Sequence, residues 1–226
     1  MIKYKDVSKI YNGESTALDN VNLLVEPEEF VSIVGHSGAG KTTLMKLLLA
    51  EERPTEGNIY FESLDVNTLD GGEINDLRRR IGTVFQDYRL LTNRTAYGNI
   101  AFVMEVSDRS EDEIEADVPY ALELVGLAEK SWNFPKELSG GEKQRLAIAR
   151  AIITQPDVII ADEPTGNLDP INTREVINIL KKINDLGTTV ILTTHDRNVV
   201  DMVGGRVITM DSGRIVRDDM HGKYVL

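Results

Sequence analysis

The chain alternates apolar runs with amphipathic stretches, and this alternation predicts strands and helices in turn. Several runs continue without a polar break, as is typical of strands covered on both faces. The runs predict strands at Ile2–Ser8, Val21–Val25, Phe30–Val34, Asn58–Phe61, Ile81–Phe85, Val158–Ala161, Thr188–Thr193 and Arg206–Met210. Helices are expected between them, one from Thr42 to about Ala50 and one with Val176, Leu180 and Ile183 on a single face. The pattern therefore predicts an α/β protein with a mostly parallel sheet.

Between Thr92 and Thr154 the apolar period changes to about 3.6 residues, and no strand is expected there. Ser110 and Glu113 form a capping-box pattern at the start of one amphipathic helix. Its apolar face comprises Ile114, Val118, Ala121, Leu122 and Val125. Pro119 is expected to kink that helix or to reset its start. We therefore expect a helical subdomain inserted into the sheet protein.

The composition is that of a folded protein and excludes several kinds of chemistry. Of the 226 residues, 41% are hydrophobic, which is enough for a substantial core. Cysteine is absent, so disulfides, thiol nucleophiles and Cys-ligated metals are excluded, and a cytoplasmic chain is favoured. The apolar runs are far shorter than the ~18 residues of a membrane span. The start, MIKYKDVSKIY, lacks the pattern of a signal peptide.

The charge balance argues against a nucleic-acid partner. The chain has 37 acidic and 25 basic side chains, a net charge of −12, whereas counterion release from nucleic acid needs a surplus of Lys and Arg. The best local basic patch is Arg78–Arg80, and basic residues at a helix end more often complement the helix dipole. We expect no nucleic acid to bind.

A glycine-rich turn, GHSGAGKT, joins the strand Phe30–Val34 to the next helix and matches G-x-x-x-x-G-K-[ST]. Glycines let backbone N–H groups point at phosphate oxygens, and the helix N-terminus adds positive charge. Lys41 is placed to reach the β- and γ-phosphates, and the Thr42 hydroxyl to bind Mg²⁺. The alternative is a plain turn with an N-capping Thr. The nucleotide contacts expected here are Gly35, Ser37, Gly38, Ala39, Gly40, Lys41, Thr42 and Thr43.

Two carboxylates follow the buried strand Val158–Ala161. In open α/β sheets the C-terminal strand ends line the ligand crevice, so Asp162 and Glu163 are expected to face the glycine-rich turn. Asp162 is placed to hold Mg²⁺ and Glu163 to accept a proton from the attacking water. A strand followed by Asp-Glu is also common in solvated loops, so this interpretation depends on the phosphate-binding turn.

A second candidate anion site lies at Leu138–Glu142, the segment LSGGE, which precedes another amphipathic helix. Ser139 and Glu142 form a capping-box pattern, and that role alone could explain them. Capping does not require Gly140 and Gly141. Their lack of side chains lets an anion approach the helix N-terminus closely. The phosphate loop already holds its own phosphates. A second anion-binding helix end therefore suggests contact with nucleotide of another subunit.

The ordered set of GHSGAGKT, Gln86, LSGGE, VIIADE, Asn167-Leu168-Asp169 and His195 resembles the ABC ATPases over essentially the whole chain. The resemblance implies a P-loop NTPase core at residues 1–91 and 157–226, with an antiparallel β subdomain, and a helical subdomain at 92–156. It also implies ATP and Mg²⁺ as cofactors. Two subunits would pair head to tail about a twofold axis, with each ATP between one phosphate loop and the other subunit's Ser139, Gly140 and Gly141.

The same resemblance implies roles for three further residues, each with an alternative. Tyr11 would stack on adenine, or be a half-buried aromatic. Gln86 would contact Mg²⁺ and the attacking water, or be a surface amide. His195 would contact the γ-phosphate, or cap the following helix. Asp169 before Pro170 is in any case an N-cap pattern with Pro in the first helical position.

Three segments narrow the resemblance to one branch of the family. FQDYRLL, TAYGNIAFVMEV and PTGNLD look most like the cell-division branch, which works with the integral membrane protein FtsX to control cell-wall hydrolases. This implies a subunit at the inner face of the membrane, associated with it through FtsX. PTGNLD is shared with lipoprotein-release and macrolide-export ATPases, so a transporter of those types, or of the amino-acid-import type, is the alternative.

Two other classes of protein fit the sequence less well. A small-molecule kinase would use the same phosphate loop but has no use for LSGGE. DNA-repair and translation proteins of the ABC family usually carry tandem cassettes, coiled-coil insertions or basic patches, which this sequence lacks. The stretch from Asp218 to Leu226 is either a docking segment or a frayed end.

Overall fold

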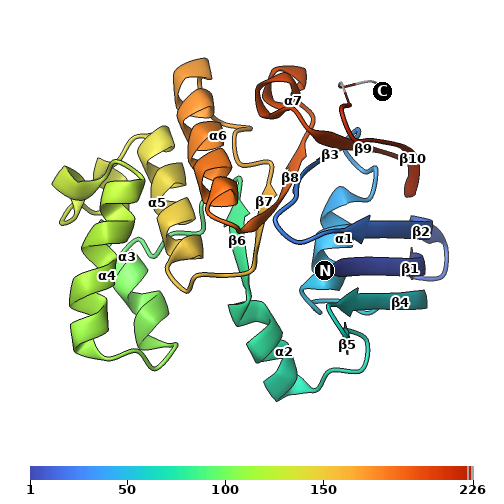
Figure 1. Cartoon of the computed structure of the whole chain (residues 1–226), viewed down its shortest axis with the longest axis horizontal. Helices are drawn as coiled ribbons and strands as arrows, with labels where there is room; N and C mark the ends of the chain where they lie inside the picture. Colours follow the sequence, from blue (N-terminus) through green and yellow to red (C-terminus); the bar gives the residue numbers. More distant parts are fainter. Residues whose placement is uncertain (223, 225–226) are drawn as a thin grey trace.

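Two β-sheets and seven α-helices make up the computed structural model, which describes residues 1–222 and 224 (Figure 1). The strands are β1 (Ile2–Tyr11), β2 (Ser15–Val25), β3 (Phe30–Val34), β4 (Glu56–Phe61), β5 (Leu64–Asp65), β6 (Ile81–Phe85), β7 (Val158–Asp162), β8 (Thr189–Thr194), β9 (Arg206–Asp211) and β10 (Arg214–Asp219). The helices are α1 (Lys41–Leu48), α2 (Gly71–Arg79), α3 (Ala96–Glu105), α4 (Glu111–Leu124), α5 (Gly140–Ile152), α6 (Pro170–Asp185) and α7 (Arg197–Val203). Two 3₁₀ helices cover Ala128–Lys130 and Pro135–Glu137.

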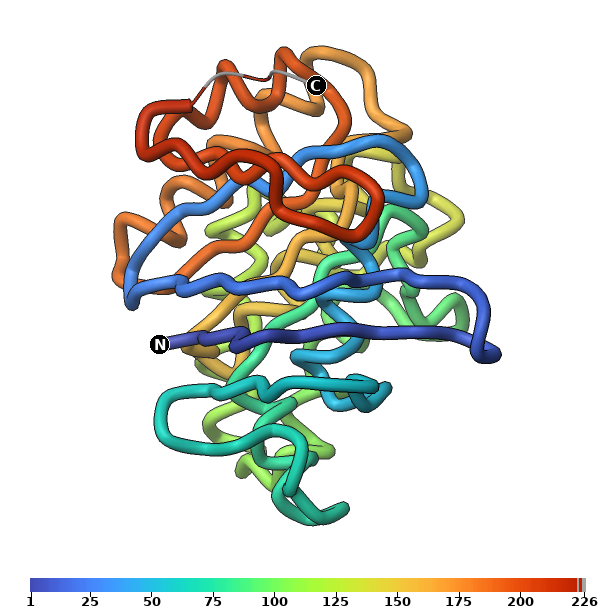
Figure 2. The backbone as a smooth tube through the Cα atoms, turned by 90° about the vertical axis from the view of Figure 1, so that its right-hand side faces the viewer, coloured from blue at the N-terminus to red at the C-terminus, as the bar shows by residue number. Residues whose placement is uncertain are grey.

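The larger sheet has the order β10-β9-β3-β8-β7-β6, and its strands are parallel except for β10. The smaller sheet, β2-β1-β4-β5, is antiparallel. The predicted α/β class with a mostly parallel sheet is therefore confirmed. β1 and β2 extend beyond the predicted strands because their far ends form an exposed hairpin with little apolar pattern (Figure 2).

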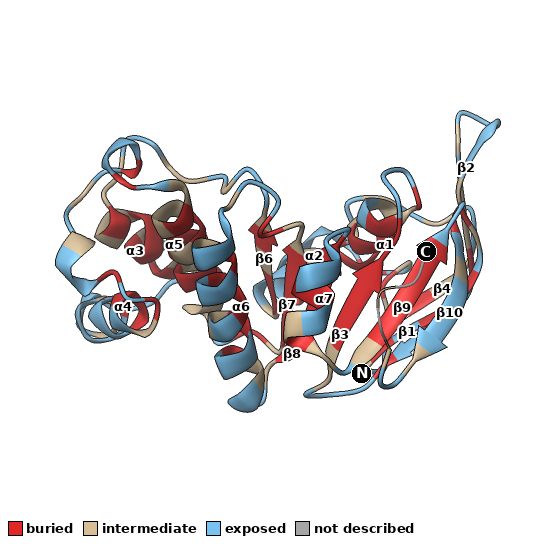
Figure 3. Ribbon diagram, turned by 90° about the horizontal axis from the view of Figure 1, so that it is seen from above, coloured by how far each residue is buried: buried red, intermediate tan, exposed pale blue. Residues whose placement is uncertain are grey.

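Side chains of the larger sheet alternate between two apolar layers. Val158 and Ile160 of β7 pack into the layer with α1 and the smaller sheet, whereas Ile159 and Ala161 pack against the helices on the opposite face. This is the double covering that the continuous apolar strands predict. Helix α1 lies between the two sheets, so the helix that follows the glycine-rich turn is held from both sides (Figure 3).

Helices α3, α4 and α5 gather at one end of the molecule, away from the smaller sheet (Figure 1). Ser110 caps α4 in the predicted capping box with Glu113, and the predicted apolar face of α4 packs into the core. The helix continues through Pro119 to Leu124, so the predicted reset of its start is wrong. The described part of this segment contains no strand, as the 3.6-residue period predicts.

The C-terminal ends of the parallel strands meet at one edge of the larger sheet. Val34 of β3 pairs with Thr194 of β8, and Asp162 of β7 pairs with both Phe85 of β6 and Thr193 of β8. The loops that follow these strands therefore all begin at this edge of the larger sheet. The folded sheet brings together segments that are far apart in the sequence.

None of the described helices, which lie within residues 1–222, is long and apolar enough to cross a membrane. Of the stretch from Asp218 to Leu226, residues 223, 225 and 226 lie outside the described residues.

Tyr4 links the smaller sheet to the helix after the glycine-rich turn. Its buried hydroxyl donates to the Leu44 carbonyl of α1 at 2.9 Å, and burial raises the pKa of Tyr4 far above its usual value. We expect Tyr4→Phe to lower the free energy of unfolding by about 1 kcal/mol, because one buried hydrogen bond is lost. Urea denaturation measures this, with Tyr120→Phe at the exposed face of α4 as the matched control. Equal stability of the two variants would contradict this expectation.

Candidate nucleotide-binding site

The glycine-rich turn curls tightly between β3 and α1. Gly38 and Gly40 have φ values of 84° and 105°, in the left-handed region that favours glycine. A Cβ on Gly40 would also lie 2.6 Å from the Ala17 carbonyl oxygen of β2. Gly40 precedes the first residue of α1, and no side chain caps this helix. The free N–H groups of the first turn of α1 are therefore available to an anion.

Lys41 places a cation inside this turn. Its side-chain ammonium donates to the carbonyl oxygens of Gly35 at 2.7 Å and His36 at 3.2 Å, and lies 3.7 Å from Glu163 Oε1. Lys41 is only 7% exposed, so its charge is poorly hydrated and depends on these oxygens. Phosphate oxygens entering the turn would be strong partners for the same ammonium group.

Asp162 and Glu163 face the glycine-rich turn, as the strand-end argument predicts. The Thr193 hydroxyl donates to Asp162 Oδ1 at 2.5 Å, and the Thr42 hydroxyl donates to Asp162 Oδ2 at 3.4 Å. Glu163 has a φ of 50°, and its backbone N–H donates to the Thr193 carbonyl and hydroxyl oxygens. Thr193 therefore holds both acidic residues in place. Sequence reasoning missed this role of Thr193.

The donor set around Asp162 fits Mg²⁺. This cation prefers hard oxygen ligands and usually takes only one or two carboxylates from the protein. Asp162 and Thr42 supply a carboxylate and a hydroxyl within hydrogen-bond distance of each other. Within the described residues no group of three or more His, Cys, Asp or Glu side chains could hold a metal without other ligands. A metal here would need ligand oxygens from phosphate and water.

His195 lies against the second carboxylate. Its Nδ1 atom is 2.7 Å from Glu163 Oε2, and its side chain is 64% exposed. The alternative role of His195 as a helix cap is wrong, because Asp196 caps α7 by accepting from Asn198 N–H at 2.8 Å. The His195 side chain is therefore not used for capping. It contacts Glu163 and lines the cavity beside it.

Gln86 leaves β6 at the same edge of the sheet. Its side-chain amide donates to Asn167 Oδ1 at 3.3 Å, in the loop that follows Glu163. A Cβ on Gly166 would lie 2.8 Å from Gln86 Nε2, so the loop approaches the amide closely. Gln86 thus connects the cavity to the Asn167-Leu168-Asp169 segment, and Asp169 caps α6 as the sequence predicts.

These groups surround a single cavity of about 750 Å³. The predicted site residues that line it are Ser37, Gly38, Ala39, Gly40, Lys41, Thr42, Thr43, Gln86, Asp162, Glu163 and His195. Sequence reasoning missed the others, namely Ser15, Thr16, Ala17, His36 and Tyr224. His36 could have been found, because it lies inside the glycine-rich motif. The remaining ones carry no local sequence signal.

Tyr11 does not line this cavity but lies close to it, at the end of β1. Its hydroxyl interacts with Glu52 and with Thr43, a residue that does line the cavity. Burial, followed by the interaction with Glu52, raises the pKa of Tyr11. The Lys9 ammonium lies 4.9 Å from the centre of its ring. Tyr11 is partly buried, so part of its side chain remains accessible.

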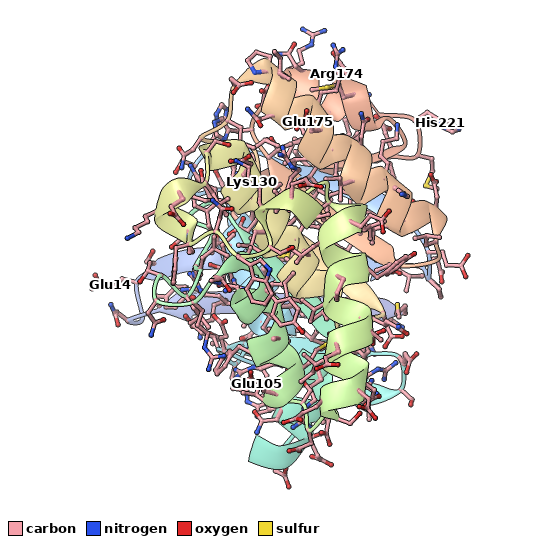
Figure 4. All side chains as sticks on the ribbon, turned by 90° about the vertical axis from the view of Figure 1, so that its left-hand side faces the viewer. Glu14, Glu105, Lys130, Arg174, Glu175 and His221 are labelled. Atoms are coloured by element: carbon pink, nitrogen blue, oxygen red, sulfur yellow. The ribbon has the colours of Figure 1, made fainter. Side chains whose placement is uncertain are left out.

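Ser139, Gly140 and Gly141 do not line this chain's own cavity. They start α5, where the Ser139 hydroxyl accepts from Glu142 N–H at 3.3 Å and Glu142 Oε2 accepts from Ser139 N–H at 2.8 Å. The predicted capping box is confirmed. The hydrogen bond from Ser139 N–H also holds the pKa of Glu142 below its usual value, and Lys130, labelled in Figure 4, lies 3.7 Å from Glu142.

Gly141 has a packing role that the sequence analysis missed. A Cβ on Gly141 would lie 1.7 Å from Asn172 Oδ1 of α6, whereas one on Gly140 would lie 3.2 Å from the Tyr88 hydroxyl. Asn172 cannot swing away easily, because its amide donates to Asp169 Oδ2 at 2.5 Å. Of these two glycines, Gly140 has the weaker packing reason to be glycine.

The comparisons with known proteins agree with this geometry. The family model described as ABC transporter matches residues 18–166. The chain belongs to this family, the ATP-binding cassette (ABC) ATPases. Within it, the chain is 48% identical to the cell division ATP-binding protein FtsE of Mycobacterium tuberculosis over 99% of this chain and 98% of the relative. It is 46% identical to FtsE of Bacillus subtilis, with 99% of this chain and 98% of the relative covered.

A solved structure titled as a dimeric post-hydrolysis state of the ATP-binding cassette MJ0796, bound to ADP and Pi, has a TM-score of 0.89. It is 37% identical and covers 99% of this chain and 100% of its own. The fold is therefore that of an ABC nucleotide-binding domain.

The contact between α5 and α6 can be tested by substituting the two glycines separately. We expect Gly141→Ala to lower the free energy of unfolding by about 1–3 kcal/mol, because the added methyl group overlaps Asn172. Gly140→Ala should lower the free energy of unfolding by clearly less than Gly141→Ala does. Adding Asn172→Ala to Gly141→Ala should recover part of the loss. Urea denaturation of the four chains checks this, and equal costs at the two glycines would contradict the packing role.

Proposed function

We propose that this chain is the ATP-hydrolysing subunit of an ABC complex that acts in bacterial cell division. The observation that carries the proposal is the convergence of Lys41, Glu163, His195 and Gln86 on one cavity beside a helix start with free N–H groups. The role in cell division is supported by the FtsE relatives, which are similar over nearly the full chain.

Glu163 is the general base of the proposed reaction. Its carboxylate accepts a proton from water while the water oxygen attacks the γ-phosphorus and ADP leaves. The left-handed backbone at Glu163 and the Thr193 contacts fix this carboxylate, and His195 lies beside it. Lys41 exchanges the Gly35 and His36 carbonyls for phosphate oxygens when ATP binds. Tyr11, next to Thr43, stacks on the adenine.

Mg²⁺ would be held by Asp162 and Thr42, with Gln86 completing the protein ligands. When bound, it neutralises negative charge on the β- and γ-phosphates. The hydrogen bond from Thr193 orients the Asp162 carboxylate for this purpose.

Two copies of the chain share each ATP in this proposal. Ser139 and Gly140 are accessible at the start of α5 but lie outside their own cavity, so a twofold pair could present them to the nucleotide of the other copy. The dimeric MJ0796 structures support this arrangement. ATP then favours the closed pair, because the γ-phosphate contacts across the interface exist only in that state.

The membrane partner would be FtsX, docked on the helical subdomain at residues 92–156. A groove of about 460 Å³ lies between α2, β6, α3 and α5, with apolar side chains at Leu91, Phe102, Val103 and Val106. Val106 is 55% exposed at the end of α3. Residues of the groove lie on both sides of Gln86 in the chain, Thr83 before it and Leu91 after it, so this segment connects the nucleotide cavity to the groove and can transmit closure of the pair to the partner. The chain thereby associates with the membrane through FtsX.

The first test separates binding from hydrolysis. We expect Glu163→Gln to bind ATP and accumulate as a closed dimer with Mg-ATP, because the amide cannot accept a proton while the other contacts survive. Lys41→Ala should lose ATP binding and remain monomeric, and Glu115→Gln on α4 is the matched control. Light scattering with and without Mg-ATP measures the state. Hydrolysis by Glu163→Gln at the wild-type rate would refute the general-base role.

The second test concerns the partner. We expect Val106→Lys to reduce co-purification with FtsX about tenfold or more, because a buried unpaired charge in the groove is costly. Leu186→Lys changes another exposed apolar residue, at the end of α6 and outside the groove, and should leave co-purification unchanged. ATP hydrolysis by both isolated variants should match the wild type. Undiminished capture of FtsX by Val106→Lys would remove the groove from the proposal.

A further inference from the structure

The chain returns to the larger sheet after its last strand. It turns at Met220 and His221, and His221 is labelled in Figure 4. The Gly222 N–H then donates to the Gly205 carbonyl at 3.1 Å. A Cβ on Gly222 would lie 2.6 Å from Val207 Cβ, so the backbone touches β9 at a distance that only glycine allows. The segment after β10 is thus anchored on the sheet rather than directed away from it.

Beyond this anchor, Tyr224 reaches the nucleotide cavity. Its partly buried ring packs against a small apolar cluster of Val34, Val200 and Val207. Val34 is the last residue of β3, directly before the glycine-rich turn. Tyr224 also lines the cavity that contains Lys41. The ring is therefore held by apolar contacts at the border of the cavity.

The packing contacts of Tyr224 place it next to the phosphate-binding turn, because Val34 directly precedes that turn and Val200 lies on α7, the helix that follows His195. The charges of Glu163 and Asp196 both act on its hydroxyl, and these residues follow β7 and β8 at the sheet edge. Tyr11, by contrast, is next to Thr43 at the other side of the glycine-rich turn. Tyr224 therefore lines the same cavity as Glu163, the base that faces the γ-phosphate in the proposed reaction.

The hydroxyl of Tyr224 is a hydrogen-bond donor under ordinary conditions. Burial, and then the negative charges of Glu163 and Asp196, raise its pKa above the usual value, so the phenol keeps its proton. An arriving triphosphate adds negative charge beside two carboxylates, Asp162 and Glu163, that also line the cavity. The protonated hydroxyl of Tyr224 can donate a hydrogen bond to a phosphate oxygen, whereas an ionised tyrosine would add another negative charge.

We propose that Tyr224 is a further residue of the nucleotide site, whose hydroxyl donates a hydrogen bond to the γ-phosphate of ATP. The inference rests on the proposed ATPase function and adds a contact from the segment after β10. The anchor at Gly222 and the cluster of Val34, Val200 and Val207 position the ring for this contact.

The test compares nucleotides with and without the γ-phosphate. We expect Tyr224→Phe to bind a non-hydrolysable ATP analogue about tenfold more weakly, because one hydrogen bond to a charged group is lost. ADP affinity should remain within about twofold, since ADP lacks that phosphate. The phenyl ring keeps the apolar contacts, so a purely structural role would leave both affinities unchanged. Tyr120→Phe on α4 is the matched control.

Gly222→Ala provides an independent variant that leaves Tyr224 itself intact. The added methyl group displaces the anchor from Val207, so the same selective loss for the ATP analogue is expected. Unchanged or tighter analogue binding by Tyr224→Phe, or an equal loss for ADP, would overturn the inference. If the wild-type chain binds neither nucleotide, the proposed ATPase function fails and this contact fails with it. If the wild type binds both nucleotides but Tyr224→Phe shows no selective loss for the ATP analogue, only the proposed Tyr224 contact is refuted.

Discussion

The parallel register of β3, β8, β7 and β6 is the constraint on which the rest of the structure depends. Hydrogen bonds between these strands place Val34, Phe85, Asp162 and Thr194 at one edge. The loops that follow must therefore start side by side, although they are separated by up to about 160 residues. This register brings the glycine-rich turn, Gln86, Glu163 and His195 together, and contacts such as those of Glu163 with Lys41 and His195 then form between them. Two apolar layers, one on each face, hold the register in place.

Electrostatics then decide what this edge can bind. The chain carries a net charge of −12, yet Lys41 is a nearly buried cation satisfied by backbone carbonyls and by Glu163. A triphosphate suits such a site, because its oxygens can replace the carbonyls as partners of the Lys41 ammonium group. The chain as a whole is acidic, yet this cavity offers a cation and free N–H groups to phosphate oxygens.

The sequence predicted those parts of the site that are local in the chain. The glycine-rich turn, the acidic strand end, the capping box at Ser139 and the N-cap at Asp169 each have a characteristic local pattern. The parallel strands of the larger sheet were also predictable, because most of their residues are apolar. β5 and β10 were missed, because one is two residues long and the other is largely exposed and polar.

Features that depend on tertiary approach could not be read from the sequence. Gly141 is explained by Asn172, which is 31 positions away and on another helix. Thr193 orients Asp162 only because β7 and β8 are neighbours, and Tyr224 reaches the cavity only because the chain folds back on β9. Such contacts form only after the strands have paired, so the order of residues along the chain does not predict them.

The central claim is that two copies of this chain enclose each ATP, with the phosphate loop from one copy and the start of α5 from the other. A crystal structure of the chain with Mg²⁺ and a non-hydrolysable ATP analogue tests it most directly. The account predicts a twofold pair in which Ser139 of one copy contacts the γ-phosphate held by Lys41 of the other. A structure in which the analogue fills the cavity while Ser139 is remote from every nucleotide would contradict the account.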